Sequence, residues 1–214
     1  MKISNQFITC LIFFSLLSNL YSQTSIKAKN LLDEISLILK NHKNYQFDFK
    51  YILENNQENI RQETSGSIIV SGNKYKLLTN DITQFSDGNN LYTIIPENLE
   101  VMITKPDDED NTILNPTELI EVYKSGYDFL WDIVQNISGQ KIQYIKLIPT
   151  EDNDDISYIL LGINMKLKQI YKLIEVGKQR TTTTLTIEKF NINNNLPSNL
   201  FTFNKDLYSE YYIN

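Results

Sequence analysis

The stretch YQFDFKYILE, residues 45–54, alternates apolar and polar side chains almost without interruption. Successive side chains of a β-strand point to opposite faces, so one face would carry Tyr45, Phe47, Phe49, Tyr51 and Leu53. One apolar face and one wet face are typical of an antiparallel sheet with solvent on one side. The segment therefore predicts a half-buried antiparallel strand and a mainly β fold.

Ahead of this strand, the apolar spacing changes to that of a helix. Apolar residues recur every three or four positions, as on one stripe of an amphipathic helix, at Ala28, Leu31, Leu32, Ile35 and Leu39. Thr24 or Ser25 can cap the first turn. We expect an N-terminal helix whose apolar stripe packs on the sheet.

Turn residues divide the chain that follows into short apolar runs. Together with the strand at 45–53 these runs predict about ten strands, the others lying near residues 66–70, 75–79, 91–95, 99–104, 127–134, 141–148, 156–163, 169–176, 181–190 and 201–203. Asn115-Pro116 starts a short mid-chain helix, because asparagine caps well and proline suits the first turn. The pattern predicts an α+β chain, a barrel or strongly curved sheet with helical cover.

Residues 1–22 have the features of a secretory signal peptide. Lys2 precedes an apolar run from Phe7 to Leu20, and Ser22 offers a small residue before a cut ahead of Gln23. An uncleaved N-terminal anchor is the alternative, which the shortness of the run disfavours. The rest, residues 23–214, fits a single domain. The only cysteine, Cys10, lies in the signal, so the mature chain has no disulfide and no thiol nucleophile.

The composition argues against several functions. The formal net charge is −6, which opposes binding to nucleic acid or to anionic lipid headgroups. The single histidine, His42, follows the first helix without a catalytic partner nearby, and we expect neither an enzyme nor a cofactor. The acidic runs at residues 107–110 and 151–155 lack the glycine and distal glutamate of a calcium loop. We predict that they are solvated turns and that the chain has no metal site.

Some of the predicted strands are apolar on both faces. In the segment 156–163, Ile156, Tyr158 and Leu160 would point one way and Ile159 and Leu161 the other. A second apolar face needs cover from a helix, or it needs a ligand. The sequence leaves both possibilities open.

Several short motifs follow one another along the chain: the opening helix with YxFxF at 45–49, GSIIV at 66–70 with KYKL at 74–77, DGNNLYTIIP at 87–96, NPTELI at 115–120, and the closing segments 187–190 and 201–203. Taken in order, these motifs resemble the LolA-like outer-membrane lipoprotein carriers. The resemblance covers nearly all of the mature chain, and the order and spacing of the motifs carry it.

The resemblance implies an unclosed, strongly curved antiparallel β-barrel whose concave apolar face is covered by the two helices. The acyl chains of a lipoprotein would lie inside while it crosses the periplasm from the inner to the outer membrane. Each buried methylene contributes about 0.8 kcal/mol, so one chain contributes roughly 10 kcal/mol. The implied partners are acylated lipoproteins, an inner-membrane lipoprotein-releasing ABC exporter and an outer-membrane acceptor. We expect a periplasmic monomer.

The expected acyl-chain site follows from the same resemblance. The cavity-lining residues would be Phe47, Phe49, Ile68, Val70, Tyr75, Leu77, Tyr92, Ile94, Val101 and Ile103, and the lid residues Leu119, Ile120 and Tyr123. The sequence does not say which face of each strand is concave. The turn Ser71-Gly72-Asn73 lacks the basic residue and proline that many members carry there, so the lid would be gated differently or the cargo would differ.

Two other classes of protein remain open. A module of similar shape could sense mislocalised lipoproteins or carry another amphiphile of the cell envelope. A non-catalytic interaction domain could have the same sheet without an open cavity. The identity of the cargo and the packing of the interior distinguish these from a carrier.

Overall fold

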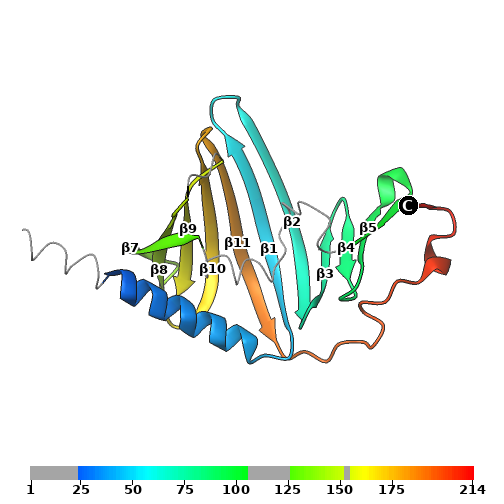
Figure 1. Ribbon diagram of the computed structural model, residues 1–214, viewed down its shortest axis with the longest axis horizontal. Helices are drawn as coiled ribbons and strands as arrows, with labels where there is room; N and C mark the ends of the chain where they lie inside the picture. The colour runs from blue at the N-terminus through cyan, green and yellow to red at the C-terminus, as the bar shows by residue number, and fades with distance from the viewer. Residues whose placement is uncertain (1–23, 106–125, 152–154) are drawn as a thin grey trace, which may run out of the picture.

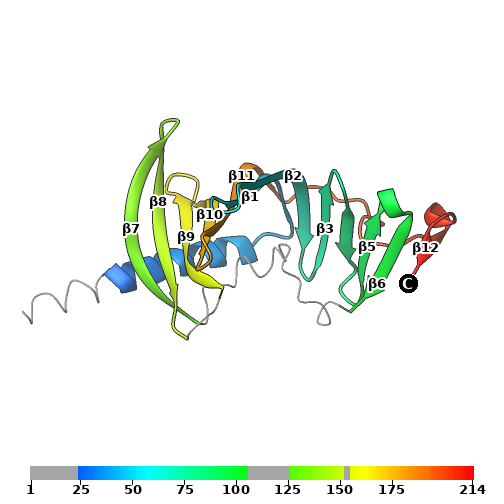
Figure 2. The ribbon, with the colours of Figure 1, turned by 90° about the horizontal axis from the view of Figure 1, so that it is seen from above.

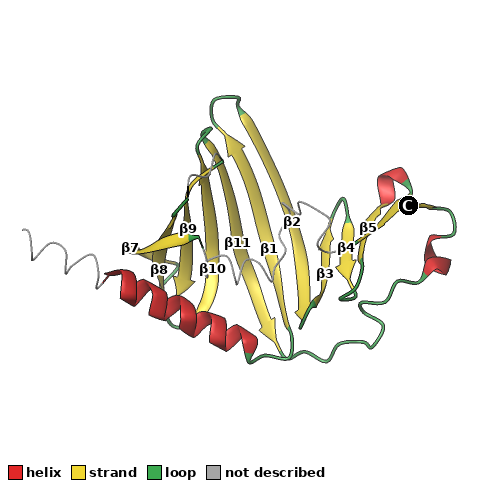
Figure 3. Cartoon of the chain, viewed as in Figure 1, coloured by secondary structure: helices red, strands yellow, loops and turns green. Residues whose placement is uncertain are grey.

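The computed structural model describes residues 24–105, 126–151 and 155–214. These residues form one helix, over residues 24–40, and one sheet of twelve strands in the order β12-β6-β5-β4-β3-β2-β1-β11-β10-β9-β8-β7. Figure 3 shows that strands dominate the chain. The expected signal peptide and mid-chain helix, with Leu119, Ile120 and Tyr123, lie outside the described residues.

Consecutive strands are antiparallel neighbours from β1 to β6 and from β7 to β11, and the pairing of β1 with β11 joins these two runs into one sheet. Their bounds are β1 (Tyr45–Asn55), β2 (Ile60–Ser71), β3 (Lys74–Thr79), β4 (Thr83–Ser86), β5 (Leu91–Ile95), β6 (Glu100–Thr104), β7 (Tyr127–Ile137), β8 (Gln140–Pro149), β9 (Ile156–Asn164), β10 (Gln169–Gly177), β11 (Thr181–Ile192) and β12 (Tyr212–Ile213). The 3₁₀ turns are η1 (Pro96–Asn98) and η3 (Lys205–Tyr208). Only β12 pairs in parallel, with β6. The sheet does not close, and the expectation of an unclosed curved sheet is confirmed.

Two details of the predicted strands were wrong. The structure adds β4 and β12, whereas residues 201–203 form no strand. The C-terminal segment, residues 193–211, instead crosses the back of β3 to β6 as irregular chain with one 3₁₀ turn, and β12 then joins the edge of the sheet (Figure 2). We call this segment the C-terminal strap.

The sheet curves strongly, and the N-terminal helix lies in its concave side (Figure 1 and Figure 2). β1 is central, since β2 and β11 pair with it along its whole length. The apolar alternation of residues 45–53 therefore became a strand whose inward side chains, including Phe47 at 6% and Phe49 at 3% exposure, are buried in the core.

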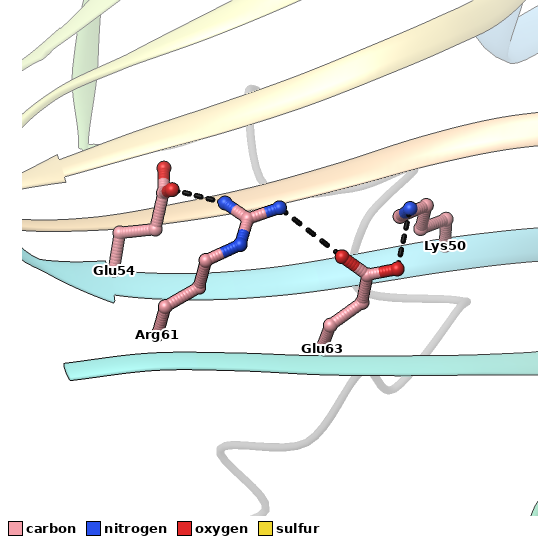
Figure 4. Close-up of polar contacts among 4 residues, drawn as sticks. All are labelled: Lys50, Glu54, Arg61 and Glu63. Atoms are coloured by element: carbon pink, nitrogen blue, oxygen red, sulfur yellow. Dashed lines mark hydrogen bonds and ion pairs between the residues drawn. The ribbon is translucent and has the colours of Figure 1, made fainter.

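The β1–β2 hairpin carries its charged side chains on the outer face (Figure 4). Lys50 Nζ lies 2.5 Å from Glu63 Oε1, Arg61 Nη2 lies 3.1 Å from Glu63 Oε2, and Arg61 also pairs with Glu54. The hydrogen bond from Lys50, followed by the pairing with Arg61, lowers the pKa of Glu63. These side chains are exposed, so the network fixes hairpin register more than it adds stability.

Gly66 allows β1, β2 and β3 to approach closely. A Cβ added there would lie 2.8 Å from the ring atom Cζ of Phe49 and in collision with the backbone carbonyl oxygen of Leu78. We therefore expect Gly66→Ala to lower the free energy of unfolding by about 1.5 kcal/mol, because a carbonyl inside a sheet cannot move aside. Urea unfolding measures the loss. Ser65→Ala, at the exposed neighbouring position, should change stability by less than about 0.5 kcal/mol, and equal effects of the two changes would contradict the packing at Gly66.

Candidate functional site

The concave face is apolar from β7 to β3, and beyond the polar inward side chains of β4 it continues to Leu91 of β5. Its buried members and those of the helix form one cluster, made of Ala28, Leu31, Leu32, Ile35, Leu39, Tyr45, Phe47, Phe49, Ile68, Val70, Tyr75, Leu77, Leu91, Ile145, Leu147, Ile159, Leu161, Ile163, Leu173 and Leu185. Half-buried aromatic residues pack around it, among them Tyr51, Phe129 and Trp131. Strand alternation explains the arrangement, since every second residue of each strand faces inward.

The helix covers this face with the apolar stripe that its sequence predicted. Leu32 is 1% exposed, whereas Leu37, on the outer side of the same helix, is 62% exposed. Polar contacts between the helix and the sheet add to this cover: Lys27 Nζ lies 4.0 Å from the ring centroid of Trp131, and Glu34 Oε2 lies 2.8 Å from Lys168 Nζ. Both are partly exposed, so each contributes little compared with the apolar stripe.

The end of the helix is tied to the end of β11. The Asn44 side chain donates to the backbone oxygen of Asn194 at 3.0 Å and accepts from the Asn194 backbone N–H at 2.9 Å. The Lys43 backbone N–H donates to Asn193 Oδ1 at 2.9 Å, and the side chains of Asn193 and His42 lie 3.4 Å apart. These hydrogen bonds fix the position of the chain between the helix and β1 against the end of β11.

Six of the ten predicted cavity residues lie together on the concave face. They are Phe47, Phe49, Ile68, Val70, Tyr75 and Leu77, and all belong to the cluster that includes the helix. The register explains their grouping, because Phe47 opposes Ile68 and Ile68 opposes Leu77 across neighbouring strands. Their role in binding acyl chains stays a prediction.

The structure places the other four residues on the opposite face. Tyr92, Ile94 and Val101 form a second cluster with Phe85, and the C-terminal strap packs on it through Phe203, Tyr208 and Tyr211. Ile103 opposes Tyr92 and is 36% exposed on that same face. The expectation that all ten residues share one surface is therefore corrected. β5 is apolar on both faces, and the strap covers the face that the sequence assigned to the cavity.

Sequence reasoning missed a second half of the concave face, on β7 to β11. Phe129 and Trp131 alternate with Leu130 on β7 and oppose the buried Leu147 and Ile145 of β8. The alternation of these residues could have predicted that Phe129 and Trp131 face the interior. The chain contains one tryptophan, and it lies on this face beside the helix, so its fluorescence reports on whatever occupies the concave side.

The concave face also contains a buried polar chain on its β3–β5 side. The Tyr75 hydroxyl donates to Gln84 Oε1 at 3.1 Å, and Gln84 Nε2 donates to Thr93 Oγ1 at 3.1 Å. Because buried polar groups cost little once they are hydrogen-bonded, this chain is compatible with an apolar surrounding. Burial also raises the pKa of Tyr45, so its hydroxyl stays neutral at physiological pH.

Glu175 is a carboxylate at the edge of this apolar face. Burial first, and then the charge of Asp155, raises its pKa. A carboxyl group whose folded-state pKa is raised stabilises the fold fully below its unfolded-state pKa, and that stability is lost as pH rises through the folded-state pKa.

We therefore expect Glu175→Gln to melt at a higher temperature than the unchanged chain at pH 7, by about 1–3 °C, and the two to converge at pH 4. Calorimetry at both pH values checks this. The control Glu97→Gln, at an exposed position of η1, should leave the melting temperature at pH 7 within about 1 °C of the unchanged chain. A Glu175→Gln gain that persists unchanged at pH 4 would refute the role of ionisation.

The described residues show no metal centre: within them, no group of three or more histidine, cysteine, aspartate or glutamate side chains could hold an ion. Residues 106–110 and 152–154, which include most of the two acidic runs, lie outside the described part of the chain. Among the described residues, no helix is long and apolar enough to cross a membrane.

The geometry defines a class of fold, an open antiparallel half-barrel with an apolar concave face and a helix lying against it. The family described as "Outer membrane lipoprotein carrier protein LolA" matches residues 17–168. The chain belongs to this family, and the resemblance drawn from its motifs is confirmed. The described part of the chain beyond the match includes β10, β11 and the C-terminal strap. No curated protein matches the sequence.

Solved structures share this fold at low sequence identity. An uncharacterized conserved protein from Thermus thermophilus is 8% identical, with 84% of this chain and 96% of that one covered and a TM-score of 0.58. MucB, also solved with MucA from Pseudomonas aeruginosa, is 13% identical, with 84% and 64% covered and a TM-score of 0.51. A putative outer membrane lipoprotein-sorting protein domain from Vibrio parahaemolyticus is 12% identical, with 86% and 99% covered and a TM-score of 0.46.

Proposed function

We propose that this protein is a periplasmic carrier that shelters the acyl chains of lipoproteins against its concave face. An inner-membrane lipoprotein-releasing ABC exporter would load it, and an outer-membrane acceptor would receive the cargo. The signal peptide, cleaved near Ser22 and Gln23, would bring residues 23–214 to the periplasm as a single domain. Membership of the carrier family supports the proposal.

The proposal rests on the way in which the N-terminal helix covers the concave face. In the described part of the chain, one amphipathic helix covers an apolar surface that extends over most of the sheet. A helix held mainly by apolar contacts is exchangeable, because an acyl chain can replace its side chains against the same surface. Each methylene transferred there contributes about 0.8 kcal/mol.

The cargo would contact residues from both halves of the face. Phe47, Phe49 and Leu77 belong to one half, and Phe129 and Trp131 to the other. None of these side chains is charged, so the face can orient an acyl chain only by shape. The selectivity for lipoproteins over free lipids would then come from groups at the rim.

Quenching of Trp131 tests the proposal. The mature chain is mixed with a palmitoylated peptide whose acyl chain carries bromine, and tryptophan fluorescence is followed. We expect saturable quenching, since bromine quenches only at contact and Trp131 lies on the concave face.

A double variant provides the matched control. In Trp131→Phe with Phe203→Trp, the only tryptophan belongs to the strap and packs on the back of the sheet. The brominated chain should leave its fluorescence unchanged. Equal quenching of both proteins, or none of either, would refute an acyl site on the concave face.

A further inference from the structure

We propose that the cleft between β10 and β11 binds an extended peptide, the segment that directly follows the acylated N-terminus of the cargo. The inference rests on the proposed carrier function and names the part of the cargo that the apolar face does not hold. The cleft measures about 570 Å³ and is lined by the turns β7–β8 and β9–β10 and by the facing ends of β10 and β11.

The cleft exists because β10 and β11 pair over only half of their length. Their ladder runs from Val176↔Thr182 to Lys172↔Thr186 and ends there. Beyond that point β10 pairs only with β9, and β11 pairs only with β1. Figure 1 shows the two strands diverging toward the end where the helix passes. Each strand thus presents one edge to the cleft with no ladder partner among the described residues.

Two unpaired strand edges are complementary to an extended polypeptide. The edges present backbone N–H and C=O groups, which an added strand satisfies by β-augmentation. A bare acyl chain has no such groups and would leave those donors and acceptors unpaired. The backbone of the cleft therefore favours a peptide over a lipid tail.

The side chains of the cleft change from polar to apolar toward the interior. Gln169, Glu188 and Lys189 line it together with Ile170 and Phe190. The ring of Phe190 stacks on those of Tyr45 and Phe47, at centroid distances of 6.1 and 6.4 Å, and Phe47 belongs to the concave core. An apolar wall thus runs from the cleft into the acyl site, as the junction of an acyl group and a peptide requires.

The cleft lies beside the ion pair that links the helix to the β9–β10 turn. Lys168 of the β9–β10 turn pairs with Glu34 of the helix at 2.8 Å, and the neighbouring Gln169 lines the cleft. Peptide in the cleft would therefore lie next to the point where the helix is held. The peptide can leave the protein here without passing beneath the whole helix.

Protection of a thiol tests the proposal. The mature chain has no cysteine, because the only one lies at position 10, so Glu188→Cys places a unique thiol in the cleft. At ten times its Kd, a palmitoylated hexapeptide should slow maleimide labelling of this thiol about tenfold, since only the free fraction reacts. Palmitic acid at the same occupancy should not slow it. Thr184→Cys, where β11 is paired on both sides, is the matched control and should respond to neither probe.

The outcomes separate this proposal from the carrier function. If the brominated form of the palmitoylated peptide quenches Trp131 but the peptide leaves labelling of Glu188→Cys unchanged, the peptide leaves elsewhere and the cleft proposal is wrong. If palmitic acid slows labelling equally, the cleft holds the acyl chain and the peptide assignment falls. If the brominated forms of both probes leave Trp131 fluorescence unchanged, the carrier function itself fails, and this proposal fails with it.

Discussion

Leu32→Ala is expected to lower the free energy of unfolding by about 3 kcal/mol, the loss typical of truncating a fully buried leucine. Leu32 is 1% exposed and lies at the centre of the helix stripe, between the helix and the concave face. The truncation removes apolar burial and leaves a cavity, and the helix gains no other contact in return. Urea unfolding followed by Trp131 fluorescence measures the loss, because that side chain lies beside the helix.

The same helix supplies the control for this prediction. Leu37→Ala makes the same chemical change on the outer side, where the side chain is 62% exposed. Leucine and alanine are both good helix formers, so this change should alter stability by less than about 0.5 kcal/mol. A difference of under about 1 kcal/mol between the two variants would mean that the helix is not docked on the sheet as described.

The sequence predicted the fold best where the apolar residues of a segment followed a single period. Residues 45–53 alternate strictly, and this single pattern predicted the central strand together with the face that it buries. The helix stripe was equally predictable, because five apolar residues at helical spacing leave only one face that can be buried. The family match later covered the same segments.

β4 was missed because its inward side chains are polar. Gln84 and Ser86 are 7% and 2% exposed, and a buried glutamine leaves no apolar alternation to detect. Gln84 is tolerated there because Tyr75 donates to it and Thr93 accepts from it. Because these hydrogen-bond partners lie on other strands, the sequence around Gln84 does not predict them.

The separation of Tyr92, Ile94, Val101 and Ile103 from the other six residues could not be predicted for a related reason. β5 is apolar on both faces, so periodicity cannot choose between them. The choice depends on what covers the back of the sheet, and that cover comes from Phe203 and Tyr208, more than a hundred positions later in the chain. Phe201–Phe203 had the composition of a strand, but Phe203 serves as an aromatic anchor within irregular chain.

Phe203→Ala is expected to lower the free energy of unfolding by about 2.5 kcal/mol, because this ring anchors the strap. It stacks on Tyr92 and on Tyr208, at centroid distances of 4.8 and 5.5 Å, and lies 6.5 Å from Phe85. Losing it removes the ring contacts of the strap with Phe85 and Tyr92. Urea unfolding measures the cost.

Acyl-chain binding by the Phe203→Ala variant tests whether the two faces of the sheet act separately. Phe203 lies on the opposite face from Trp131, so a folded Phe203→Ala chain should still show full quenching by a brominated palmitoyl peptide, with an unchanged Kd. Leu207→Ala, at a 73% exposed position of the same strap, should change neither stability nor binding. If Phe203→Ala weakened binding while keeping its fold, the back of the sheet would take part in cargo recognition, and the separation of the two faces would be wrong. Unchanged binding with reduced stability would instead assign the strap a purely structural role and leave the concave face as the acyl site.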